Sequence, residues 1–354
     1  MILAVSDMAH VAARYAGRWQ PVKARVYAFD RGSLIRARPS VATSSSLLAP
    51  LREPCSPSAV PVGSPPKSAA NVVDMLLPLA LLAAGALHPE RSALWFACAG
   101  VAWAALLTVV LGGAALVHAL SLRAPTEARI QGVRTRPALI AAEAFESTRA
   151  MFIAATLAAW PLTQWQLGRA TGMVHGLDAL AARGFTPVSM TLVTLGGVVV
   201  MDAWLYWKHR LLHTRWLFSF HKAHHAFRDP TAFAAFAVAP VESLLTFWPI
   251  LLLCWTEAVH WLPLYATLVL GFMLLNFYLH CGVTVRWVER ILPRALFNTS
   301  AFHNLHHARA MTHFGEALTV WDHVCGTTAL PLGRSESGES GALTPPGPPA
   351  KLST

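Results

Sequence analysis

The chain has 354 residues, of which 55% are hydrophobic and 13% are charged, and its formal net charge is +10. Soluble domains usually carry about a quarter of their residues as charged side chains, so the composition excludes an ordinary soluble domain and indicates a membrane protein. No basic stripe interleaved with aromatic residues marks a nucleic-acid-binding module. The five cysteines are scattered without a C-x-x-C pair, which argues against both a disulfide framework and a thiolate metal site.

Residues 1–70 differ from the rest of the chain, because they are rich in Ser, Pro and basic residues and contain no apolar run of spanning length. This arm is predicted to be disordered, and its composition also resembles an organelle transit peptide. A wrongly assigned start, with translation beginning near Met75, is the alternative. Residues 333–354 are rich in Ser, Gly and Pro and are predicted to form a disordered tail.

Residues 71–332 are predicted to form one transmembrane domain, with a catalytic core at 187–332. A helix crosses about 30 Å of hydrocarbon with about 20 apolar residues. The apolar stretches are, in order, Val72–Leu87, Leu94–Leu120, Ala150–Leu167, Pro187–Trp207 and a paired stretch at 243–280. His260 and Pro263 interrupt the last stretch, which therefore predicts a hairpin of two helices. The predicted fold is all-α, a polytopic membrane protein with about four to six transmembrane helices.

Basic residues are unevenly distributed between the connecting segments. Segments 121–149 and 208–228 each carry five Lys or Arg residues, whereas the turn near Pro89 and the loop at 169–186 carry one and two. Because Lys and Arg favour the cytosolic side of a membrane, the ends of the apolar stretches that meet the basic segments are predicted to be cytosolic. A helical cap on that side is expected to hold the residues described next.

Three histidine clusters lie beside the apolar stretches. Their patterns are H-x-x-x-H, H-x-x-H-H and again H-x-x-H-H, formed by His209 and His213, by His221, His224 and His225, and by His303, His306 and His307. On a helix, positions i, i+3 and i+4 share a face, so each cluster is expected to direct its imidazoles at one point. Eight imidazoles exceed the tetrahedral shell of one metal ion. The spacing therefore predicts two metal ions.

Elimination narrows the kind of metal site. Glu242, Glu257, Glu289 and Glu316 show no Glu-x-x-His spacing, which a carboxylate-bridged di-iron bundle would need. The zinc peptidase pattern H-E-x-x-H is absent, and a bis-histidine haem protein needs single facing histidines. An all-nitrogen dinuclear site remains, with iron, zinc or copper as possible metals.

Further residues are candidates to complete the site. His280 ends the hairpin's return helix and is expected to be a ninth ligand, with Asn276 one turn earlier on the same face. Asp202 lies seven residues before His209, so its carboxylate is expected to hold a ring N–H. His313 and Asp322, together with His323, are candidates for the surroundings of the metals.

Residues 140–332 resemble the fatty acid hydroxylase / sterol desaturase superfamily of membrane di-iron enzymes, and most closely the sterol C5-desaturases (lathosterol oxidases). The resemblance rests on DAWLYWKHRLLH from Asp202, HKAHHAFRDPTAFAAFAVAPVES from His221, NTSAFHNLHH from Asn298 and THFGEALTVWDHVCGT from Thr312. Departures are Ala239 in place of the His of an H-P pair, Phe302 in place of the first His of A-H-H, and His313-Phe314 in place of Asn-Tyr. None of them affects the eight clustered histidines.

The resemblance implies that two iron ions held by these histidines use O2 to desaturate or hydroxylate a C–H bond of a lipid. A sterol-like substrate is expected, with a fatty acyl or sphingolipid hydroxylase as the alternative. The chain has no dinucleotide fingerprint and no cysteine cluster, so cytochrome b5 or a ferredoxin with its reductase is expected to supply electrons. The expected docking rim comprises Lys208, Arg210, Arg215 and Lys222. A membrane zinc lipid hydrolase and a metal transporter are the alternatives from other classes.

Overall fold

The computed structural model describes residues 72–88, 90–131 and 137–329, and these residues form helices and loops with no strand. The all-α prediction is therefore confirmed. The predicted arm at 1–70 and tail at 333–354 lie outside the described residues.

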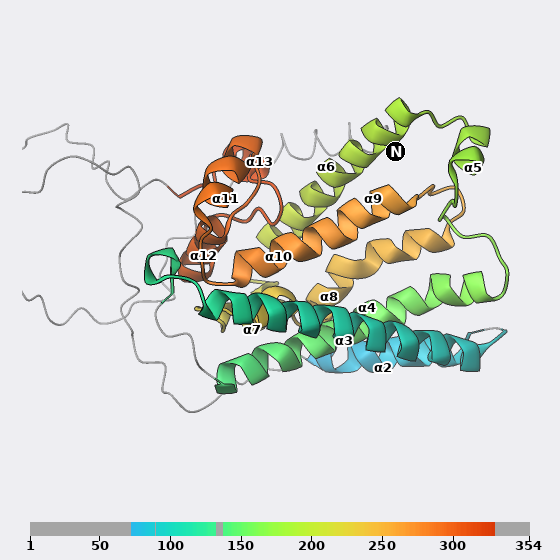
Figure 1. The fold of residues 1–354 in the computed structure, drawn as a ribbon. Helices are drawn as coiled ribbons and strands as arrows, with labels where there is room; N and C mark the ends of the chain where they lie inside the picture. The colour runs from blue at the N-terminus through green and yellow to red at the C-terminus, as the bar shows by residue number, and fades with distance from the viewer. Residues whose placement is uncertain (1–71, 89, 132–136, 330–354) are drawn as a thin grey trace, which may run out of the picture. The chain divides into compact units, whose positions relative to one another are not determined.

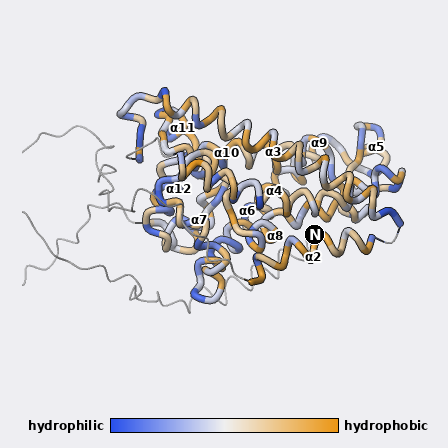
Figure 2. Tube along the Cα trace, turned by 90° about the horizontal axis from the view of Figure 1, so that it is seen from below, coloured by the Kyte–Doolittle hydropathy of each residue, from blue (hydrophilic) through white to orange (hydrophobic). Residues whose placement is uncertain are grey.

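Long apolar helices lie side by side and form the body of the protein (Figure 1). Ser92–Leu122 (α3), Pro187–Leu212 (α6) and Leu262–His280 are long and apolar enough to cross a membrane. Two shorter apolar helices, Val72–Ala86 (α2) and Pro240–Cys254, accompany them. The body exposes large aliphatic side chains such as Val101 and Leu192, and hydrophobic residues cover most of its length (Figure 2). The chain is therefore built as an integral membrane protein.

The predicted hairpin is present, and its two halves are irregular helices. The first half joins α8 (Pro240–Phe247) to the 3-10 helix η5 (Trp248–Cys254). The second half joins α9 (Leu262–Ala266), the π-helical segment η6 (Thr267–Gly271) and α10 (Phe272–His280). Pro263 stands in the first turn of α9, where its missing N–H costs no hydrogen bond. Pro263 therefore lies at the start of the second helix, and the interruption between the two halves precedes it.

Helix α4 (Pro137–Gln166) is longer than predicted and is the buried helix of the body. It begins at Pro137, well before the predicted start at Ala150. Its small residues Ala150, Ala155 and Ala159 are at most 1% exposed, so neighbouring helices approach closely along this face. The indole of Trp103 on α3 donates a hydrogen bond to Thr148 O at 3.3 Å. Apolar composition alone does not distinguish such a buried helix from a lipid-facing one.

Short helices gather at one end of the body and form a cap (Figure 1). They are η3 (Phe218–Phe220), α7 (Lys222–His225), η4 (Ala232–Phe236), α11 (Arg286–Ile291), η7 (Leu292–Ala295), α12 (Ser300–Arg309) and α13 (Val320–Val324). The single-turn η2 (Thr126–Ala128) follows α3. Helices α6 and α10 both end at this cap. The last turns of two long helices therefore meet the cap, and this junction holds the histidines.

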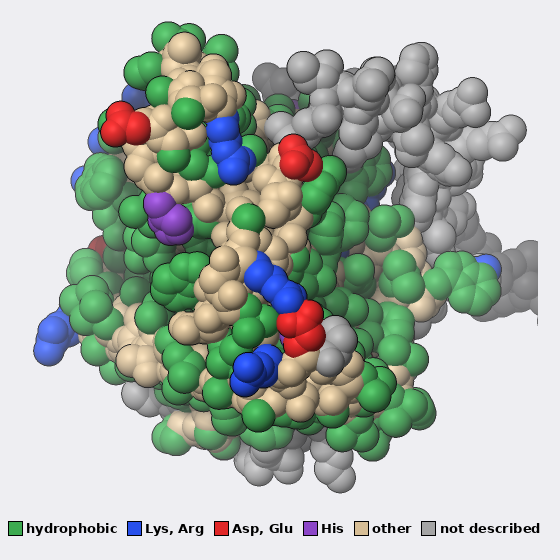
Figure 3. Space-filling view, turned by 90° about the vertical axis from the view of Figure 1, so that its right-hand side faces the viewer, with side chains coloured by type: hydrophobic (Ala, Val, Ile, Leu, Met, Phe, Trp, Pro, Cys, Tyr) green, Lys and Arg blue, Asp and Glu red, His purple; other side chains and the backbone are tan. Residues whose placement is uncertain are grey.

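The opposite end of the body carries α5 (Leu177–Ala182) and the connecting loops. Figure 3 shows a few Lys, Arg, Asp and Glu side chains on this face among hydrophobic and uncharged residues, and some of opposite charge lie next to one another. Arg169 and Glu90 form an ion pair there. The predicted placement of the cap on the cytosolic side stays a prediction, because the helices set no direction in a membrane.

Candidate metal centre

Two short stretches of the cap and the ends of two long helices position the histidines. Helix α6 carries His209 in its last turn and is followed by His213 at its C-cap. His221 precedes α7, which carries His224 and His225. Helix α12 carries its three histidines after Thr299, whose side chain accepts a hydrogen bond from Phe302 N. This N-cap satisfies a free amide of the first turn and fixes where the helix begins.

The structure brings together all nine histidines that the sequence predicted as ligands and divides them into two groups. The five-histidine group contains His209, His213, His221, His225 and His306, and the four-histidine group contains His224, His280, His303 and His307. Within each group the candidate ligand atoms all lie within 4.8 Å of one another. Two metal ions, one in each group, are therefore geometrically possible.

The expectation that each sequence cluster serves one point holds for His209 and His213 and is wrong for the other two clusters. His221 and His225 belong to the five-histidine group, whereas His224 belongs to the other. The cluster on α12 divides in the same way, with His306 separated from His303 and His307. Consecutive residues on a helix point about 100° apart, so neighbouring histidines in an H-H pair face different groups. Each H-x-x-H-H motif therefore contributes to both groups.

Hydrogen bonds at Nδ1 orient five of the rings. The Nδ1 atoms of His209, His280 and His306 lie 2.9, 2.9 and 2.7 Å from the main-chain oxygens of Phe314, Asn276 and Thr312. The Nδ1 atoms of His224 and His221 lie 3.3 Å from Ala237 O and 2.7 Å from Glu242 Oε2. A carbonyl or carboxylate oxygen only accepts, so each Nδ1 carries the proton and each Nε2 presents a lone pair.

Buried ring nitrogens without partners show that the site suits metal ions. Nε2 of His209 and of His221 and both ring nitrogens of His307 are buried and make no hydrogen bond. An unsatisfied buried polar atom costs about 1–3 kcal/mol, so several of them in one place need a compensating partner. Three other Nε2 pairs, such as His303 and His280, approach to 3.1 Å. Metal ions bound between these lone pairs would satisfy one nitrogen of each ring.

Burial favours the neutral form of five of these rings, which is the form that binds metals. Burial, followed by the proximity of other imidazoles, holds the pKa of His224, His225, His303 and His307 well below the usual range. For His306 burial lowers the pKa to about 3.

The residues predicted to surround the metals take different roles from those expected. Asp202 holds no ring N–H, because its Oδ1 accepts hydrogen bonds from the amides of Ala317 and Leu318 at 3.1 and 2.9 Å. Asn276 supports His280 through its main-chain carbonyl, while its side chain donates to Ala235 O.

His313 uses both ring nitrogens within the protein fold. Its Nδ1 lies 3.0 Å from Phe302 O, and its Nε2 accepts from Ala329 N at 2.8 Å. The ring also stacks on Phe302 at 3.6 Å between centroids. Because neither nitrogen is left for a metal ion, His313 is a structural residue.

Asp322 acts on the site through a loop. Its carboxylate accepts from Phe314 N and Gly315 N at 2.8 and 2.7 Å, and the carbonyl of Phe314 in turn orients His209. His323 is directed elsewhere, with its Nδ1 against Thr319 O. Asp202 and Asp322 thus hold the loop at 314–318 from two sides.

Three charged residues lie near the histidines in places that the sequence did not predict. Lys208, expected on a surface rim, is buried, and its Nζ lies 2.8 Å from Glu316 Oε1 and 3.0 Å from Thr246 Oγ1. Glu242 and Glu316 were set aside because they lack Glu-x-x-His spacing, but both lie beside site histidines. The sequence signal that could have identified Glu242 is its position as a carboxylate inside the apolar segment that begins at Pro240.

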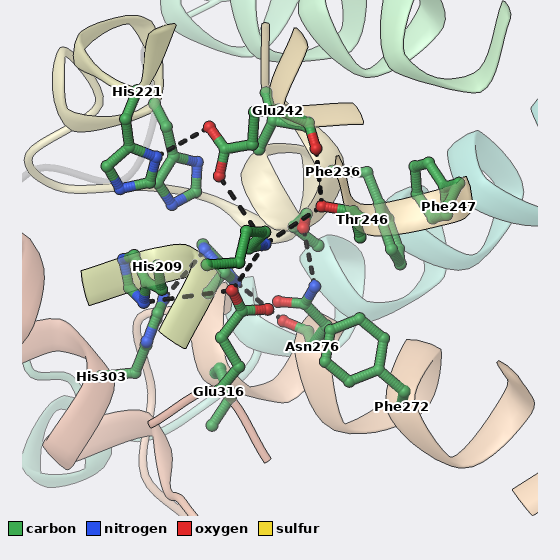
Figure 4. Close-up of a pocket in the computed structure, with 16 residues that line it drawn as sticks. His209, His221, Phe236, Glu242, Thr246, Phe247, Phe272, Asn276, His303 and Glu316 are labelled. Carbon is green, nitrogen blue, oxygen red and sulfur yellow. Dashed lines mark hydrogen bonds and ion pairs between the residues drawn. The ribbon is translucent and has the colours of Figure 1, made fainter. Parts of the chain in front are cut away.

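A cavity of about 30 Å³ adjoins both histidine groups. Figure 4 shows its polar side, where Glu242, Thr246 and Glu316 lie near His209 and His221, and its apolar side with three phenylalanines. The apolar wall comprises Phe236, Val238, Phe247, Phe272 and Leu279. The volume accommodates one or two water-sized molecules.

The fold and the site define a class, a helical membrane protein with two adjoining groups of buried histidines. Residues 194–327 match the family model described as fatty acid hydroxylase, and this stretch contains all nine histidines. The predicted resemblance to the fatty acid hydroxylase / sterol desaturase superfamily is thus confirmed for this part of the chain.

Several curated relatives of the chain carry the names of a desaturase, an oxidase and a monooxygenase. The chain is 34% identical over 135 residues to lathosterol oxidase of Mus musculus, which covers 37% of this chain and 42% of the relative. It is 29% identical over 131 residues to Delta(7)-sterol 5(6)-desaturase ERG3A of Gibberella zeae (37% and 36%) and 29% identical over 138 residues to methylsterol monooxygenase 1 of Rattus norvegicus (38% and 45%). The match thus spans less than half the length of each relative. No solved structure matches the chain.

Proposed function

We propose that the protein is a membrane-bound di-iron oxygenase that desaturates or hydroxylates a C–H bond of a lipid, with a sterol-like molecule as substrate. The observation that carries this proposal is the division of nine histidines into two adjoining groups with free nitrogen lone pairs. Iron bound there would supply O2 activation and hydrogen abstraction. The names of the relatives, a desaturase, an oxidase and a monooxygenase, support oxidative chemistry on a sterol.

The chain's own residues would orient the metals and exclude water. Carbonyls of Phe314, Thr312 and Asn276 hold the rings of the ligands, so the ligand positions are set before a metal binds. Three phenylalanines line the apolar side of the cavity that adjoins the histidines. A substrate carbon entering past this wall would meet the metals in a site closed to bulk water, which protects reactive species from side reactions.

Electrons would come from a separate carrier, either cytochrome b5 or a ferredoxin with its reductase. Lys208 is removed from the predicted docking rim because it is buried. Arg215, which is exposed and stacks 4.4 Å over the ring of Trp216, and the half-buried Lys222 remain available on the cap. An acidic carrier would be attracted to these cations at the cytosolic face.

The alternatives of other classes find less support in the geometry. A metal transporter would place its ligands near the middle of the membrane, whereas these histidines lie at the ends of α6 and α10 and in the cap. A catalytic zinc site typically has three protein ligands, which is fewer than either histidine group contains. A fatty acyl or sphingolipid hydroxylase differs only in substrate and remains the alternative within the proposed chemistry.

Metal content tests the proposal. Protein purified from iron-replete cells is expected to contain two irons per chain, and a His224→Ala/His306→Ala variant, which removes a ligand from each group, is expected to lose them. His175→Ala, an exposed histidine outside both groups, is the matched control and should keep both metals. Oxidised sterols or acyl lipids would then be sought in expressing cells by mass spectrometry. One zinc, or a folded protein without iron, would contradict the di-iron proposal.

A further inference from the structure

The two histidine groups differ in what supports their rings. Of the five Nδ1 atoms with oxygen partners, four face main-chain carbonyls and one faces a carboxylate. That carboxylate is Glu242, whose Oε2 lies 2.7 Å from Nδ1 of His221. Both side chains are at most 3% exposed. His221 belongs to the five-histidine group, so this charged support serves one group only.

A second carboxylate reaches the same group. Oε1 of Glu316 lies 4.0 Å from Nδ1 of His209, which is also a member of the five-histidine group. Lys208 connects the two acids, because its Nζ lies 2.8 Å from Glu316 Oε1 and 4.0 Å from Glu242 Oε1 (Figure 4). One buried cation between two carboxylates leaves a net negative charge beside His209 and His221.

The four-histidine group has no such support among the described residues. His224 and His280 face the carbonyls of Ala237 and Asn276, and Nδ1 of His303 and of His307 makes no hydrogen bond. No carboxylate in the described ranges 72–88, 90–131 and 137–329 is hydrogen-bonded or ion-paired to these four rings. The same ligand type therefore lies in two unequal electrostatic environments.

We infer that the two metal positions are unequal, and that Glu242 makes the five-histidine position the tighter one by orienting and polarising His221. This inference rests on the proposed dinuclear site and deepens it. A carboxylate that accepts a hydrogen bond from a ligating imidazole raises the basicity of the other ring nitrogen, and losing such a partner typically costs 10- to 100-fold in metal affinity. Glu242 is a positioning residue, because it acts through His221.

The test measures Co²⁺ affinity from visible absorption, in two backgrounds that each retain one group. A His303→Ala/His307→Ala background keeps the five-histidine group, and a His213→Ala/His306→Ala background keeps the four-histidine group. In the first background, Glu242→Leu is expected to weaken Co²⁺ binding by about 10- to 100-fold. In the second background the same change should leave the affinity within about twofold. Glu242→Gln, which can still accept the hydrogen bond, separates the effect of charge from that of orientation.

Glu289→Gln is the matched control, because Glu289 accepts a hydrogen bond from Tyr278 Oη and should affect neither background. If a background fails to fold, the full nine-histidine chain is titrated with a chelator, and Glu242→Leu should release one Co²⁺ equivalent more readily while the other stays. Equal weakening of both equivalents, or of neither, would overturn the inference and leave the proposed function standing. A folded wild-type chain that binds neither Co²⁺ nor Fe²⁺ would overturn the proposed function itself.

Discussion

Lys208→Met is expected to destabilise the metal-free protein strongly. The ammonium is 3% exposed and lies 2.8 Å from Glu316 Oε1, 3.0 Å from Thr246 Oγ1 and 4.0 Å from Glu242 Oε1. Methionine has a similar length and keeps the packing of the stem, but it leaves two carboxylates without a counter-charge. Removing one partner of a buried ion pair costs about 3–5 kcal/mol of unfolding free energy. At roughly 2–4 °C per kcal/mol for a domain of this size, Tm should fall by about 10 °C.

Thermal unfolding in detergent, followed by circular dichroism on chelator-treated samples, measures the effect. Arg215→Met removes an exposed cation and should change stability by less than about 0.5 kcal/mol. The double variant Lys208→Met/Glu316→Gln removes both charges of the close pair and should recover part of the loss, since coupled residues are not additive. The ion-pair argument is refuted if the Tm of Lys208→Met lies within about 2 °C of the wild-type Tm. It is also refuted if the double variant is no more stable than the single variant.

Three further predictions concern the loop at 314–318, His313 and pH. Asp322→Asn should weaken the hold on Phe314 N and Gly315 N and lower stability by about 1–3 kcal/mol, measured by thermal unfolding; unchanged Tm would contradict this. His313→Asn should retain both metals, counted by elemental analysis, because both ring nitrogens are used by main-chain groups. Folding lowers the pKa of His306 from 6.5 to about 3, so the unfolded chain binds a proton at higher pH than the folded protein does. Metal-free protein should therefore lose stability as pH falls from 6.5 toward 3. A Tm that does not change between pH 7 and pH 5 would contradict this prediction.

The nine histidines could be predicted as ligands because spacing and position are sequence properties. Positions i, i+3 and i+4 lie on one side of any helix, and imidazoles next to apolar stretches are costly without partners. His280 was found in the same way, from its place at the end of the return helix. Helix α4 was only partly predicted, because the polar residues Glu143 and Glu146 in its first half broke the apolar pattern.

The roles of the charged residues could not be predicted from their positions in the chain. Lys208 follows an apolar stretch and resembles a surface cation. Its ammonium is nevertheless buried against Thr246 and Glu316, which lie 38 and 108 positions away in the sequence. Asp202 has the helical spacing to support His209, but amides of the loop at 317–318 take its carboxylate. Glu242 and His221 lie on different helical elements, so no helical spacing relates them. They come into contact only because α8 approaches the cap.

The sequence by itself determined that the chain is a helical membrane protein with enough histidines for two metals, because hydropathy and helical period are local properties. Only the tertiary structure decided which histidine joins which group and which group receives a carboxylate. Adjacent rings of an H-H pair point about 100° apart, so their assignment depends on what each direction meets. In this protein α6, α8 and α10 and the loop at 314–318 provide those surroundings, and they come from parts of the chain up to 116 residues apart.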